Sequence, residues 1–259
     1  MSVSYVSHGT SEKAVIYLHG VGSGKEGWMA QRDATVEAGF RFVAIDAPGF
    51  GSTPLPDAAG FGSHVQSVLD VMQQEGLEEA VLCGHSMGGM TAQEFYAQHP
   101  QRASALVLSG TSPAFGKANG DFQKAFLRAR FEPFDQGMSM PEFANAFSAD
   151  LLGSAASDDA LRQIIEVMSP VSIPAYRRAV ETLTHFDRRD NLPSISVPVL
   201  LIAGEEDENA PAKMMEKMAS YISNATYVEL EKTGHMAPVE NADAFNQNLG
   251  AFLSRLGLT

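Results

Sequence analysis

The stretch Gly84-His85-Ser86-Met87-Gly88 constrains the fold of this chain more than any other. It follows directly on a short apolar run at residues 80–83 and precedes a helical pattern at residues 89–98. A serine between two glycines at a junction of strand and helix predicts a tight, strained turn, in which side chains at the glycine positions would clash. The following helix points its N-terminal N–H groups at the same place. This context makes Ser86 a candidate nucleophile.

Apolar, β-branched runs alternate with helical patterns along most of the chain. The runs that predict buried strands lie at residues 14–18, 42–45, 80–83, 105–108, 198–202 and 225–230. The patterns that predict helices in the same part of the chain lie at residues 27–38, 62–74, 89–98, 212–218 and 241–256. Strands that alternate with helices in this way imply an α/β fold with a mostly parallel sheet that helices cover on both faces.

The alternation stops between residues 115 and 190, where no strand pattern is found. Helical patterns occupy this part instead, at residues 122–130, 140–152, 159–168 and 174–184. We therefore expect one α/β core, formed by residues 1–114 and 191–259, that is interrupted by a helical cap of residues 115–190. A chain of 259 residues is long enough to bury such a core and a small inserted part.

Composition and charge argue against several classes of partner. The formal net charge of −13 disfavours binding to nucleic acid or to an anionic membrane surface. The single cysteine, Cys83, cannot form an intramolecular disulfide, and no Cys/His cluster has the spacing of a zinc site. The sequence shows no signal peptide and no apolar run long enough to span a membrane. We expect a cytoplasmic protein without metal or cofactor, and the sequence leaves the oligomeric state open, a homodimer included.

A serine hydroxyl becomes a nucleophile only when a base takes its proton and a third group orients that base. Asp207 and His235 each follow shortly after one of the last two predicted strands. They are therefore expected at the carboxyl edge of the sheet, where Ser86 also lies and where open α/β sheets bind ligands. Glu205 and Glu206 are adjacent carboxylates that compete with Asp207 for the same role.

Several motifs occur in a fixed order along the chain. They are His19-Gly20, the loop 46–52, the turn 84–88, the segment 204–207 followed by Pro211, and Gly234-His235. In these motifs the chain resembles a capped enzyme of the α/β-hydrolase fold over essentially its whole length. The resemblance implies catalysis by Ser86, Asp207 and His235, and an oxyanion hole formed by the backbone N–H groups of Val21 and Met87. It implies structural roles for His19 and Asp46.

The cap is rich in phenylalanine and methionine, so some of its side chains are expected to roof a pocket for a small molecule with an apolar part. The predicted pocket residues are Trp28, His85, Phe126, Phe143 and Met236. Trp28 fits equally well as the anchor of its own helix. The charged cluster near the end of the cap consists of Arg177, Arg178, Arg188 and Arg189. An arginine that reached inward would favour an acidic substrate.

Among capped subfamilies the chain looks most similar to 3-oxoadipate enol-lactonase-like hydrolases and small carboxylesterases. We therefore predict hydrolysis of a small ester or lactone through an acyl-enzyme intermediate. One alternative is a carbon–carbon bond hydrolase of the meta-cleavage type, although such enzymes usually show Asn and Trp where this chain has His85 and Met236. The others are a cofactor-free haloperoxidase or perhydrolase, and a slow-turnover ligand sensor on the same fold.

Overall fold

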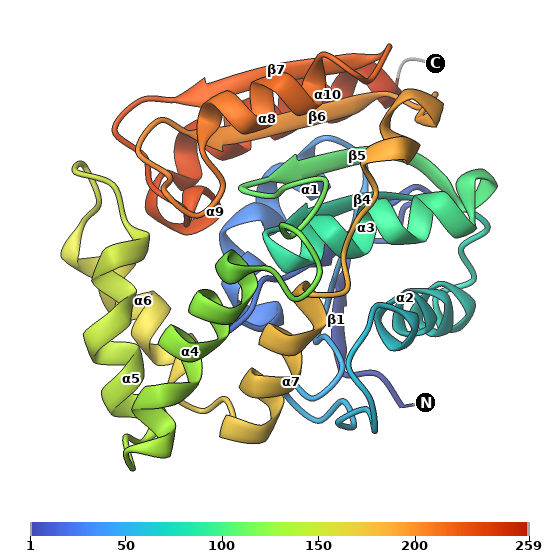
Figure 1. Ribbon diagram of the computed structural model, residues 1–259. Coiled ribbons are helices and arrows are strands. Elements are labelled where there is room, and N and C mark those ends of the chain that lie inside the picture. Colours follow the sequence, from blue (N-terminus) through green and yellow to red (C-terminus); the bar gives the residue numbers. More distant parts are fainter. Residues whose placement is uncertain (1, 258–259) are drawn as a thin grey trace.

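A computed structural model, which describes residues 2–257, shows a seven-stranded sheet with the strand order β1-β3-β2-β4-β5-β6-β7 (Figure 1). The strands are β1 Tyr5–His8, β2 Ala14–Leu18, β3 Arg41–Ile45, β4 Ala80–His85, β5 Ala103–Ser109, β6 Val199–Gly204 and β7 Ala225–Leu230. Only the edge strand β1 is antiparallel to its neighbour, β3, and the other neighbouring pairs in the described sheet are parallel. The predicted α/β fold with a mostly parallel sheet is confirmed.

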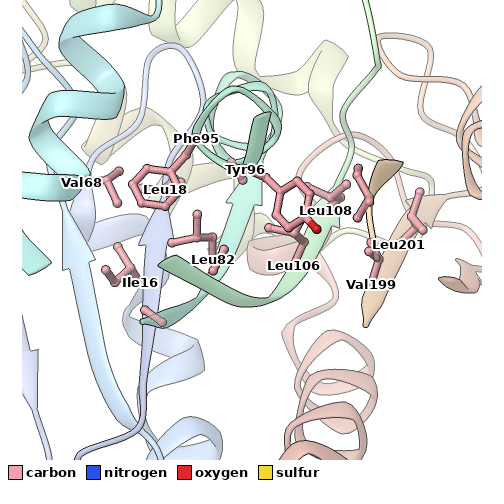
Figure 2. Packing of buried hydrophobic residues seen from close by; sticks show 14 of the residues in the cluster. Ile16, Leu18, Val68, Leu82, Phe95, Tyr96, Leu106, Leu108, Val199 and Leu201 are labelled. Carbon is pink, nitrogen blue, oxygen red and sulfur yellow. The ribbon is translucent and has the colours of Figure 1, made fainter. Parts of the chain in front are cut away.

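Helices cover both faces of the sheet because the strand side chains alternate between two apolar layers. The core helices are η1 Lys25–Gln31, α1 Arg32–Glu37, α2 Gly62–Gln74, α3 Met87–Gln98, η2 Pro100–Arg102, α8 Ala212–Ala219, α9 Ala237–Glu240 and α10 Ala242–Gly257. Along β2, Ile16 and Leu18 belong to a buried cluster with residues of α2, α3 and α8. Val15 and Tyr17 belong to a second cluster with residues of η1 and α10. Figure 2 shows part of the first cluster, in which Val68 and Phe95 lie over the strand side chains.

A group of helices connects β5 to β6 and lies in the lower part of Figure 1, away from β6 and β7. These helices are α4 Asp121–Asp135, α5 Met140–Phe147, η3 Ser148–Leu151, α6 Asp158–Met168 and α7 Ile173–Leu183, and the short helix η4 Arg189–Ser194 leads on to β6. The chain passes into and out of this group side by side. Phe115 N–H donates to the Phe186 carbonyl (3.0 Å), and Arg188 N–H donates to the Pro113 carbonyl (2.8 Å). We propose this paired neck as the boundary between core and cap.

Candidate active site

Ser86 occupies the sharp turn between β4 and α3. Its backbone adopts φ 51° and ψ −117°, a strained conformation for a residue with a side chain. The glycines on either side are needed because the backbone passes too close for any other residue. A Cβ atom at Gly84 would lie 2.2 Å from the Gly88 carbonyl oxygen, and one at Gly88 would lie 1.9 Å from the Leu18 carbonyl oxygen. The turn thus presents Ser86 at the carboxyl edge of the sheet.

The close approach at Gly88 predicts a large loss of stability on substitution. Gly88→Ala is expected to lower the free energy of unfolding by about 3 kcal/mol or more, because the new methyl group must displace the backbone of β2. Gly250→Ala is a matched control, since Gly250 also lies in a helix but has open space around its Cβ position. It should stabilise the protein by about 0.5–1 kcal/mol. Urea denaturation measures both changes, and equal effects of the two substitutions would contradict this explanation.

Asp207 and His235 form a buried acid–base pair at the same edge of the sheet. Asp207 Oδ2 lies 2.8 Å from His235 Nδ1, and Oδ1 accepts hydrogen bonds from the N–H groups of Asn209 (2.8 Å) and Ala210 (2.9 Å). Burial by itself would raise the pKa of Asp207, but the His235 ring and these two N–H groups outweigh it and keep this pKa below its usual value. Because Nδ1 faces a carboxylate, Nε2 is the ring atom left to take a proton.

The two competing glutamates are engaged elsewhere. Glu205 accepts a hydrogen bond from the Lys232 N–H (2.8 Å), and Glu206 accepts from the N–H (2.6 Å) and hydroxyl (2.7 Å) of Ser154. Both glutamates are exposed, whereas Asp207 is buried. The geometry therefore brings Asp207, and neither glutamate, to His235.

Two further residues, neither of them evident from the sequence, lie beside this pair or beside the turn that carries it. A Cβ atom at Gly110, directly after β5, would lie 3.3 Å from Asp207 Oδ2 and 3.3 Å from His235 Nδ1, so a larger side chain would press on the pair. Glu240 accepts hydrogen bonds from the N–H groups of Gly234 (3.0 Å) and Met236 (2.8 Å), on both sides of His235. The place of Gly110 directly after a predicted strand could have indicated a residue at the site. Nothing in the local sequence points to Glu240, whose role becomes visible only in the fold.

Of the two predicted oxyanion donors, Met87 directly follows the nucleophile, and Val21 comes after Gly20, where a Cβ atom would lie 3.1 Å from Ser86 Cβ. Met87 is the first residue of α3, so its N–H has no acceptor within the helix. Val21, in the loop after β2, lines the same cavity as Ser86. His19 braces this loop, because the Ala47 N–H donates to His19 Nε2 (2.9 Å) and His19 Nδ1 therefore carries the proton that it donates to the Gly20 carbonyl (2.8 Å).

Asp46 has the structural surroundings that were expected of it, on the neighbouring loop after β3. Its carboxylate accepts from the backbone N–H (2.9 Å) and the ammonium group (2.6 Å) of Lys25 and from the Ser4 hydroxyl (2.7 Å). It thereby ties the segment that follows Val21 to the edge of the sheet. A Cβ atom at Gly51 would collide with this carboxylate, which explains the glycine in the loop 46–52.

Ser86 and His235 open into a cavity of about 420 Å³ between the sheet edge and the cap helices. Its volume lies in the range of small-molecule sites. Its apolar lining from the cap and its neck comprises Ala114, Phe115, Phe122, Phe126, Phe147, Leu151, Tyr176, Val180 and Leu183. Of the predicted pocket residues, His85, Phe126 and Met236 line the cavity.

Trp28 and Phe143 do not line the cavity, so the prediction was wrong for these two residues. Trp28 is 2% exposed and packs beneath the sheet, with ring centroids 5.0 Å from Tyr17 and 6.1 Å from Phe245. It anchors its helix, the other role that its sequence position allowed. Phe143 lies inside the cap, where its ring is 4.8 Å from that of Phe134. Each side chain packs within a neighbouring apolar cluster and so does not reach the cavity.

His85 lies between the nucleophile's turn and the acid–base pair. Its ring centroid is 4.8 Å from that of His235, and neither ring nitrogen has a hydrogen-bond partner among the described residues. Burial and the adjacent His235 ring lower the pKa of His85 to about 3, against the opposing effect of the Asp207 charge. His85 is therefore neutral near neutral pH and cannot compete with His235 as a base.

The four arginines near the end of the cap do not reach the cavity, contrary to the possibility considered from the sequence. Each forms an ion pair with a carboxylate outside it. The pairs are Arg177 with Asp135, Arg178 with Glu181, Arg188 with Glu94, and Arg189 with Asp187. Within residues 2–257, no group of three or more His, Cys, Asp or Glu side chains could hold a metal ion. No helix in this range is long and apolar enough to cross a membrane.

Comparison with known proteins identifies relatives that match nearly the whole chain. The family described as alpha/beta hydrolase fold matches residues 13–242. A 2-hydroxy-6-oxononadienedioate/2-hydroxy-6-oxononatrienedioate hydrolase of a Pseudomonas species is 28% identical, over 95% of this chain and 90% of the relative. The 3-oxoadipate enol-lactonase 2 of Acinetobacter baylyi is 25% identical, over 98% and 94%. An esterase from Thermogutta terrifontis shares the fold, with a TM-score of 0.87 at 23% identity over 98% of this chain and 93% of that chain.

Proposed function

We propose that this chain, which belongs to the α/β hydrolase fold family, cleaves a small carboxylic ester or lactone through an acyl-enzyme intermediate. The observation that carries the proposal is the meeting of three groups at one cavity. Ser86 and His235 line it, and Asp207 lies 2.8 Å behind the far nitrogen of His235. A hydroxyl, a base and an orienting carboxylate in this arrangement are the parts that acyl transfer needs.

Each step follows from the positions of these groups. Ser86 Oγ attacks the carbonyl carbon while His235 Nε2 takes the hydroxyl proton, and Asp207 stabilises the resulting imidazolium. The oxygen of the tetrahedral intermediate accepts hydrogen bonds from the N–H groups of Met87 and Val21, which contribute about 3 kcal/mol each. His235 then gives its proton to the leaving alcohol or enol oxygen. A water molecule then attacks the acyl carbonyl carbon while His235 takes its proton. His235 returns this proton to Ser86 Oγ as the bond to the acyl group breaks and the carboxylic acid leaves.

Carbon–carbon bond cleavage is the second candidate, and the Pseudomonas relative supports it. The same three residues can serve both chemistries, so the triad does not discriminate between them. A carbon leaving group must first be ketonised, which requires polar groups over the substrate opposite the serine. The lining that the cap contributes is mainly apolar, with Arg130 as its one charged side chain, and this composition favours the ester or lactone. A small-molecule substrate and a cytoplasmic location stay predictions, and the oligomeric state stays open.

A substrate panel tests the proposal directly. The protein is expected to turn over short-chain p-nitrophenyl esters and at least one lactone, and to leave meta-ring-fission diketones unchanged. Initial rates measured by absorbance for each class decide the ranking. Efficient cleavage of a ring-fission diketone with feeble ester turnover would reverse it. Ester turnover of a few events per protein molecule would instead indicate a ligand sensor.

A further inference from the structure

Arg130 is a cationic side chain in the wall of the cavity that contains Ser86. It comes from α4, and its guanidinium carbon lies 4.9 Å from the ring centroid of Phe126 and 4.0 Å from that of Phe147. Both rings line the same cavity. The two aromatic faces therefore hold a positive charge beside the space that a substrate would fill.

This cation has no protein counterion among residues 2–257. The ion pairs and hydrogen bonds of the described residues include none on Arg130, in contrast to the four arginines near the end of the cap. Ring contacts leave its five N–H donors without an acceptor. The side chain is only partly exposed, and burial lowers its pKa, although a guanidinium stays protonated in proteins. A partly buried guanidinium without a counterion can bind an anion that enters the cavity.

The other ionisable groups around the cavity do not neutralise Arg130. Burial raises the pKa of Tyr176 to about 12, so Tyr176 keeps its proton. Asp150 is exposed and lies beyond ion-pair distance, although its charge acts on Arg130. Glu208, on the loop after β6, lines the cavity without pairing with Arg130. The remaining two, His85 and His235, carry no negative charge.

We infer that Arg130 binds an ionised carboxylate of the substrate, so that the site takes esters or lactones bearing a free carboxylate, an inference that rests on the proposed function. A guanidinium binds a carboxylate through two parallel, charge-assisted hydrogen bonds, and these are strong where water is largely displaced. The phenylalanine rings contact the apolar part between the carboxylate and the ester. Ser86 attacks the ester carbonyl at the other end.

Matched substrate pairs test this assignment on both sides of the ester bond. p-Nitrophenyl hemiglutarate and p-nitrophenyl valerate differ by a carboxylate in the acyl part, and 4-acetoxybenzoate and p-tolyl acetate differ by one in the alcohol part. In at least one pair, the wild type should prefer the anionic ester. Arg130→Met, which keeps an apolar stem against the rings, should lower the anionic-to-neutral ratio of kcat/KM by about 10- to 100-fold. Arg130→Lys should restore part of it.

The control is Arg128→Met, which removes an exposed charge two residues away on α4 and should leave the ratio within about 2-fold, since a surface charge contributes little at this range. Binding supplies a readout that needs no turnover. Ser86→Ala should bind the anionic ester of at least one pair, and adding Arg130→Met should raise the Kd of that ester by at least about 10-fold in calorimetry.

The outcomes separate this inference from the proposed function. If neutral esters are hydrolysed and Arg130→Met lowers kcat/KM equally for both members of each pair, Arg130 is structural and the carboxylate assignment is wrong. A wild type without preference for either anionic ester would also overturn it. If no ester of any kind is hydrolysed, the proposed function fails, and the calorimetric comparison still decides whether Arg130 binds the carboxylate.

Discussion

Ser86→Ala is expected to abolish labelling by a fluorophosphonate probe and to lower kcat by on the order of 10⁴- to 10⁶-fold. The expectation follows from the position of Ser86 at the turn after β4, where the strained backbone holds the hydroxyl at the cavity. We expect no other hydroxyl to take over the covalent step. Intact-protein mass spectrometry followed by peptide mapping would measure how many probe molecules bind and where.

The cavity itself supplies the controls for this experiment. Ser23 and Ser112 also line the cavity, so their hydroxyls are the alternative nucleophiles within reach of a bound ester. The Ser112 hydroxyl already donates to the Ala114 carbonyl (2.9 Å). Probe attached to Ser23 or Ser112 in the wild type, or full activity in Ser86→Ala, would contradict the assignment.

Asp207→Asn is expected to lower kcat by on the order of 10⁴-fold while leaving the fold intact. An asparagine can keep the contact with His235, but its amide can donate to Nδ1 and so favour the tautomer with its proton on Nε2. That tautomer cannot take the Ser86 proton. Steady-state kinetics on a p-nitrophenyl ester give the effect, and circular dichroism shows whether the fold is retained.

The adjacent glutamates are matched controls for the acid. Glu205→Gln and Glu206→Gln each change one carboxylate within two residues of Asp207, but their hydrogen bonds go to Lys232 and Ser154, away from His235. Each is expected to change kcat by less than about 5-fold, as is usual for exposed polar contacts. If a glutamine variant loses most of its kcat and Asp207→Asn does not, the acid has been assigned to the wrong residue.

Local sequence was sufficient for most of the strands and helices. The predicted strands 14–18 and 225–230 match β2 and β7, and the predicted helix 62–74 matches α2. β2 is fully buried, and β7 and α2 pack their apolar residues against the core. Weaker patterns gave errors. The segment predicted as one helix at 27–38 is a 3₁₀ helix followed by a short α-helix, and the segment at 140–152 ends its α-helix at Phe147.

Tertiary contacts decided the elements that the sequence did not reveal. β1 has no apolar run, since its residues are partly or fully exposed at the sheet edge, and its strand conformation depends on pairing with β3. The short helix α9 begins directly after Met236 and has only four residues, too few for a periodic pattern. In both cases the element contacts a segment distant along the chain, β3 for β1 and η1 for α9, where Gln31 donates to the Pro238 carbonyl.

The same division applies to the site. The sequence alone determined where Ser86, Asp207 and His235 would lie, because residues that follow parallel strands meet at one edge whatever the details of packing. It did not determine which cap side chains face the cavity. Helical periodicity marks Phe126 and Phe143 equally as buried, but only packing places one at the cavity and the other inside the cap. Arg130 shows this most clearly, because a single arginine in a helix has no local signal and becomes a candidate binding group only when two phenylalanine rings enclose it.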